Sequence, residues 1–143
     1  ILLVIVATAM SCGQQSVEEL WKKANAEENP DRRIEILSKA IELEPDNPEA
    51  YFKRGELHAQ YVMMVKDAVA QGMRDDDSLD DEHFDAALKD LTRTIELDST
   101  LSKALWWRGN AQSYMKHTVE ACKDWHSAIA LGFDATIEKS LCP

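Results

Sequence analysis

Two six-residue stretches, Ala50-Tyr-Phe-Lys-Arg-Gly55 and Ala104-Leu-Trp-Trp-Arg-Gly109, share one pattern and lie 54 residues apart. A second matching pair accompanies them, Ala40-Ile-Glu-Leu-Glu-Pro45 and Thr94-Ile-Glu-Leu-Asp98. A helix that carries aromatic residues and a glycine, paired with an alanine-rich amphipathic helix, is the sequence form of a helical repeat. Such repeats stack into curved surfaces and rarely perform chemistry themselves. The pattern therefore predicts a binding protein.

The repeat resembles the tetratricopeptide repeat, whose unit is a pair of antiparallel helices. The resemblance implies an all-α fold of three repeats in a short right-handed solenoid, spanning residues 14–47, 48–101 and 102–135. In the third repeat Leu105 and Gly109 lie on the first helix, and Ala121 and Trp125 lie on the second. The first repeat is degenerate because Trp21 replaces the usual small residue.

Local signals agree with an all-helical fold. Ser16 with Glu19 forms a capping box, and Asn29-Pro30 and Asn47-Pro48 each read as an N-cap followed by proline at the first helical position. We expect Gly132 to end the last repeat helix and Asp134 to cap a final short helix over residues 135–141.

The second repeat is longer than its family unit, with 54 residues against about 34. Neither glycine nor proline interrupts residues 61–71, so the first helix should continue to near Gly72. The return helix should begin at Ser78. The pattern predicts an elongated hairpin that includes residues 62–81, bearing Met63, Met64 and Met73 and an acidic tip over residues 75–81.

The N-terminal eleven residues carry no charge and are followed by Cys12. This run is too short to span a bilayer, which takes about 20 residues, and it fits the apolar core of a secretory signal. Ala9-Met-Ser-Cys12 resembles the lipobox of bacterial lipoproteins, which implies lipidation of Cys12. We therefore expect a signal remnant over 1–11, a lipidated linker over 12–15 and a repeat domain over 16–143. The alternative is a buried N-terminal helix.

The other two cysteines, Cys122 and Cys142, fall on either side of the turn at Gly132. Two antiparallel arms of nearly equal length would bring them level, and an oxidising compartment would let them form a disulfide. The alternative is that Cys122 is a small core residue and Cys142 lies in a frayed end. Similar cysteine placements recur in periplasmic tetratricopeptide lipoproteins.

Composition excludes several kinds of partner and activity. A chain with a net charge of −10 and no basic stripe cannot neutralise nucleic-acid phosphates, so we expect no nucleic-acid partner. For the same reason it should not be attracted to anionic lipid headgroups, and a membrane link should come only through the lipid anchor. The four histidines include no His-Glu-x-x-His pair, and the Asp75–Asp81 region lacks the pattern of a calcium loop. We expect no enzyme activity, no cofactor and no metal, although the acidic tip leaves a metal-binding alternative open.

The family resemblance also implies where a partner binds, because the first helix of each repeat lines the concave groove. Aromatic rings beside amide and basic groups suit an extended peptide. The alternative is that the two aromatic rings Phe52 and Trp106 pack against neighbouring helices. The groove positions carried onto this chain are Lys22, Asn25, Phe52, Glu56, Gln60, Lys103, Trp106, Asn110 and Tyr114.

Taken together, these features predict a protein-interaction adaptor of the bacterial cell envelope. It would be a periplasm-facing lipoprotein, most simply of the outer membrane, that binds a protein or peptide in its groove. The alternative is an accessory subunit of an envelope complex for outer-membrane assembly, pilus formation or secretion. In that case the hairpin over residues 62–81 would dock rather than the groove.

Overall fold

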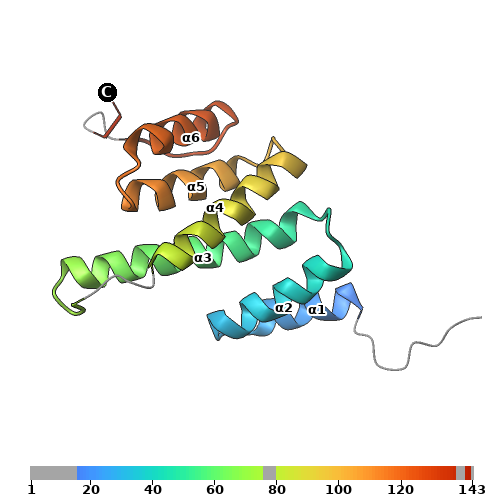
Figure 1. The fold of residues 1–143 in the computed structure, drawn as a ribbon. Coiled ribbons are helices and arrows are strands. Elements are labelled where there is room, and N and C mark those ends of the chain that lie inside the picture. Colours follow the sequence, from blue (N-terminus) through green and yellow to red (C-terminus); the bar gives the residue numbers. More distant parts are fainter. Residues whose placement is uncertain (1–15, 76–79, 138–140, 143) are drawn as a thin grey trace, which may run out of the picture.

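The computed structural model describes residues 16–75, 80–137 and 141–142, and within them every regular element is a helix. Three antiparallel pairs follow one another and stack into a short solenoid (Figure 1). The helices are α1 (Val17–Ala26), α2 (Pro30–Leu43), α3 (Pro48–Ala70), α4 (Asp80–Leu97), α5 (Ser102–Tyr114) and α6 (Thr118–Ala130). The expected all-α repeat architecture is confirmed.

The helix starts follow the predicted caps. The Ser16 hydroxyl accepts from the Glu19 amide at 3.2 Å, and Asn29 accepts from the Arg32 amide at 3.0 Å. Asn47 accepts from the Glu49 amide at 3.0 Å, with Pro48 in the first helical position. These bonds satisfy amides that have no partner inside the helix.

Helices α3 and α6 end in the same hydrogen-bonding pattern. Gly72 and Gly132 adopt positive φ of 68° and 89°, and the next residue's amide bonds back to Ala68 and Ala128 respectively. This is the Schellman arrangement, which favours glycine because its missing Cβ permits the left-handed backbone.

The core lies where the second and third repeats meet. Phe52, Val62 and Leu91 are buried in one cluster with residues of α5 such as Ala104 and Ala111. α3 packs against both α4 and α5. The small residues of α5 let α3 and α5 approach closely, so these two repeats form one packed unit.

Each of these two repeats contains an arginine that clamps three helices. Arg54 makes a two-pronged ion pair with Asp90 at 2.7 and 2.8 Å and donates to the Ser38 hydroxyl of the preceding repeat. The hydrogen bond to Asp90 raises the pKa of the Arg54 guanidinium. Arg108 repeats the clamp with Asp124, at 2.7 Å twice, and with Thr92. Each arginine side chain is only 20 % exposed.

The two repeat glycines provide the space that the paired helices occupy. A Cβ on Gly109 would lie 2.7 Å from the Trp125 indole and 3.1 Å from the Ala121 carbonyl oxygen. A Cβ on Gly55 would lie 2.9 Å from Leu91 Cγ. Helices α5 and α6 therefore pack at a distance that only glycine permits.

Gly109→Ala is expected to lower the free energy of unfolding by up to about 2 kcal/mol, which is the overpacking cost less the gain in helix propensity. Overpacking costs about 1–3 kcal/mol, and the better helix propensity of alanine returns about 1 kcal/mol. Urea unfolding of the purified variant measures the difference. In a Trp125→Leu background the same substitution should cost less, because the ring that it strikes is gone. An equal cost in both backgrounds would contradict this account.

The elongated hairpin of the second repeat is confirmed. α3 runs 23 residues without interruption, and its end extends beyond the neighbouring helix pairs (Figure 1). Part of it is supported, since Val65 is 2 % exposed and the Tyr114 hydroxyl donates to Asp67. Met64 and Met73 are 59 % and 70 % exposed. α4 is helical from Asp80, and Ser78 lies outside the described residues.

The expected final helix over 135–141 is not formed in its described part. Residues 133–137 have no regular structure, and residues 138–140 lie outside the described residues. Seven residues are too few to repay helix nucleation, and the β-branched Thr136 and Ile137 disfavour it further. The segment instead lies against α5 and α6 as an irregular tail, here defined as residues 133–137 with 141–142.

Candidate partner-binding surface

Three of the predicted groove residues come together in one cleft. Asn25 of α1 and Glu56 and Gln60 of α3 line a cleft of about 130 Å³. Side chains from three helices complete its walls. The remaining lining residues are Ala24, Arg33, Leu37, Lys53 and Leu57.

The cleft exists because the first repeat joins the second through only one of its helices. α2 packs against α3, whereas α1 packs against α2 and, within the described residues, not against α3. The second and third repeats differ, since α3 and α5 are in contact. Counted from the helix starts, Ala24 rather than Trp21 holds the position of Gly55 and Gly109, since each is the eighth residue of its helix. The small residue that the sequence reading found missing is therefore present and buried, and the inner face is open because α1 and α3 do not pack together.

Glu56 lies among the charged side chains of this face. Burial raises the pKa of its carboxyl group, while the charges of Lys53 and Lys103 and a hydrogen bond from Trp107 act in the opposite direction. Lys103 of α5 therefore faces Glu56 across the inner surface. In a chain of net charge −10, this face holds a carboxylate among cations and amides, which together can pair with a peptide backbone and its charged groups.

The other predicted groove residues lie in different settings. Lys22 is exposed on α1. Phe52 is 6 % exposed and belongs to the core, so its assignment to the groove was wrong. Its ring fills the junction with α5, where burial of apolar area outweighs exposure to a partner. Tyr114 packs against the same core and bonds Asp67.

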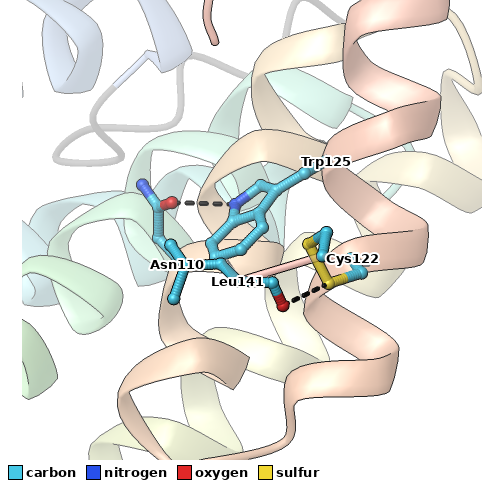
Figure 2. The surroundings of a disulfide bond; sticks show 5 residues. Asn110, Cys122, Trp125 and Leu141 are labelled. Atoms are coloured by element: carbon cyan, nitrogen blue, oxygen red, sulfur yellow. Dashed lines mark hydrogen bonds between the residues drawn. A yellow bond between two sulfur atoms is a disulfide. The ribbon is translucent and has the colours of Figure 1, made fainter. Parts of the chain in front are cut away.

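Trp106 and Asn110 lie under the tail. The Trp106 ring stacks on Phe133 with centroids 4.8 Å apart, and it lies 6.0 Å from the Trp125 ring. Asn110 accepts a 2.9 Å hydrogen bond from the Trp125 indole N–H (Figure 2). The third repeat's part of the groove is thus covered by the chain's own C-terminal segment.

A disulfide holds this tail in place. Cys122 of α6 is bonded to Cys142, with their Cα atoms 5.6 Å apart. Leu141 lies beside the bond, with its carbonyl oxygen 3.3 Å from the Cys122 sulfur (Figure 2). The second arm after Gly132 is irregular rather than helical, yet it brings the two cysteines level.

Sequence reasoning overlooked Arg33 as a cleft residue. Its guanidinium donates to the Glu27 backbone oxygen, which fixes it beside the loop between α1 and α2. The sequence pattern was also not used to assign a role to Asp90 and Asp124. The recurrence of Lys-Asp before Leu91 and Trp125, each paired with an Arg-Gly, was the available signal for the clamp.

Several predicted features fall outside this surface. Cys12 and residues 76–79 of the acidic tip lie outside the described residues. Among the residues that the structure describes, no helix is long and apolar enough to cross a bilayer. No cluster of three or more metal-binding side chains occurs in the same part of the chain.

Stacked antiparallel helix pairs with an open inner face define a helical-repeat solenoid. Comparison with known families supports one repeat type, because residues 34–60 match the TPR repeat family. This stretch contains most of α2, the second helix of the first repeat, and the Arg54-Gly55 motif. Residues 34–60 are therefore similar to a tetratricopeptide repeat, and they lie within a helical-repeat fold.

Solved structures agree with this fold. The Arabidopsis OM64 TPR domain superposes with a TM-score of 0.67 at 20 % identity, covering 87 % of this chain and 89 % of that one. The first TPR of Spaghetti (RPAP3), bound to the HSP90 peptide SRMEEVD, gives a TM-score of 0.64 at 20 % identity, covering 83 % and 81 %. No curated protein matched the sequence significantly.

Proposed function

We propose that this protein is an interaction adaptor that binds a protein or peptide partner on its inner face, between α1 and α3. The observation that carries the proposal is the convergence of Asn25, Glu56 and Gln60 in one cleft. Amide groups pair with an extended backbone, and the mixed charges of Lys53, Lys103 and Glu56 select the side chains beside it.

The comparisons add support of a general kind. The matched family is a TPR repeat, and the two solved structures named above are TPR domains. One of those structures holds a short peptide. This likeness supports peptide binding as the mode of action.

A photo-crosslinking residue in place of Gln60 tests the proposal in cells that express the protein. Gln60 is exposed and lines the cleft. We expect one dominant adduct, identified by mass spectrometry. The matched control replaces Glu42, which is exposed on α2 and outside the cleft. Equal or scattered adducts at both positions, from protein that remains folded, would overturn the proposal.

We further propose that the adaptor is tethered through a lipidated Cys12 in the bacterial envelope, facing the periplasm. The support is the uncharged run over residues 1–11 and a disulfide, a bond that persists in oxidising compartments. Metabolic labelling with a radioactive fatty acid should mark the full-length protein, and Cys12→Ser should abolish the label. Labelling that survives this substitution would refute the tether.

The long hairpin is a second candidate surface, favoured by the exposure of Met64 and Met73. Methionines are common at adaptable binding surfaces. A crosslinker in place of Met64 separates the two models. Adducts at Met64 without adducts at Gln60 would assign the docking role to the hairpin.

A further inference from the structure

The tail and the last helix pair form an open pocket at the surface, separate from the α1–α3 cleft. Its volume is about 300 Å³. We call it the Trp106 pocket. The lining residues are Trp106, Asn110, Trp125, Thr136, Ile137 and Leu141.

The repeat register shows what this surface is shaped to receive. Trp106 stands 54 residues after Phe52, so the two occupy the same position in successive repeats. Phe52 is buried where α5 of the next repeat packs on α3. Trp106 has the same position on α5, and there the tail residue Phe133 stacks on its ring. The face of α5 that carries Trp106 is therefore equivalent to the face of α3 on which Phe52 is buried. Such a face is suited to burying apolar groups of a neighbouring element.

The chain itself demonstrates the preference of this face for an aromatic ring. Phe133 stacks on Trp106 with a 25° angle between the rings. Phe133 does not line the pocket, whose walls are instead two indoles, Ile137 and Leu141. Aromatic rings attract each other at centroid distances of about 4.5–7 Å. A pocket of this size lies at the small end of the range for ligand sites, which suits a single side chain better than a larger molecule.

Two polar groups at the edge would orient the guest. Asn110 uses its oxygen to accept from Trp125, and its amide nitrogen is a donor group. Thr136 is exposed and brings a hydroxyl. An apolar pocket with a few polar groups at its rim is typical of an anchor site for a partner's side chain.

We infer that the Trp106 pocket binds one aromatic side chain of the protein partner, with the disulfide-held tail forming one of its walls. This inference rests on the proposed adaptor function and names a chemical feature of the partner. It does not depend on the α1–α3 cleft, so the two can fail separately.

The test is a titration with N-acetyl-phenylalaninamide, followed by the indole N–H signals of the four tryptophans in NMR spectra. The signals of Trp106 and Trp125 should shift and saturate, with a dissociation constant on the order of 1 mM for a probe of this size. Trp21 and Trp107 do not line the pocket, so their signals should stay unchanged. N-acetyl-glutaminamide should produce no saturable shift.

Two tail variants provide the matched comparison. Thr136→Arg fills the pocket mouth and should weaken probe binding at least tenfold. Asp134→Arg places the same side chain on an exposed tail position outside the lining and should leave binding unchanged. No saturable shift at Trp106 and Trp125, or equal binding by both variants, would overturn the inference. Probe binding without a Gln60 adduct would retain the pocket and refute the cleft.

Discussion

Asp90→Ala is expected to lower the free energy of unfolding by about 3 kcal/mol, since it leaves a partly buried guanidinium without its anion. Asp90 is only 2 % exposed, and both of its carboxylate oxygens accept from Arg54. The aspartate is also the anchor that lets Arg54 reach Ser38 on the preceding repeat. Urea unfolding followed by circular dichroism measures the change.

Two controls separate the clamp from a general sensitivity to lost charge. Arg54→Met with Asp90→Leu removes both charges and should recover much of the loss, because a buried pair adds little over apolar packing. Asp46→Ala breaks an ion pair with Arg93 in which the Asp46 side chain is 82 % exposed, and no measurable change is expected. A loss below about 0.5 kcal/mol for Asp90→Ala would contradict the clamp, given typical surface effects of that size.

Removing the disulfide should have an effect of similar size at the C-terminal end of the solenoid. Cys142→Ser opens a loop whose ends are 20 residues apart, and the loop-entropy relation gives about 3 kcal/mol for such a loop. The tail should then leave Trp106. We expect a lower unfolding midpoint and a red shift in tryptophan emission, because the indole loses the cover of Phe133.

The spectroscopic change distinguishes release of the tail from a uniform loss of stability. Phe133→Ala keeps the disulfide and removes only the ring that stacks on Trp106, so it should shift the emission with a smaller change in stability. Adding a dithiol reductant to the unaltered protein should reproduce the Cys142→Ser result. An unchanged emission spectrum after complete reduction would show that the disulfide does not hold the tail on α5.

The fold was predictable because its determinants are local and repeated. The Arg-Gly motifs and the asparagine caps each act within one or two helical turns, and an uninterrupted run predicted the long α3. The tail was not predictable in the same way. The cysteine pairing followed from the turn at Gly132, but the irregular path of the tail depends on Phe133 reaching Trp106, a contact that no local pattern encodes.

The candidate site was predicted less completely, for a related reason. Family register places Phe52 and Glu56 alike on the inner helix of their repeat, but one is buried and the other lines the cleft. The difference arises from the packing of neighbouring helices: α3 meets α5 closely and does not meet α1. The position of a residue within the repeat predicts the face of the helix on which it lies. Whether that face is accessible to a partner depends on how the next repeat packs against it.

The asymmetric attachment of the first repeat has a consequence for the dynamics of the molecule. In a linear array, resistance to local opening is the sum of each unit's own stability and its contacts with neighbours. Among the helices that the structure describes, α1 and α2 are joined to the rest through α3 alone, so this pair should open before the others and exchange its amide hydrogens soonest. A ligand spanning α1 and α3 would add the missing contact and slow that exchange. Binding in the cleft would then reduce the local opening of the whole α1–α2 pair, although the ligand contacts only part of that pair.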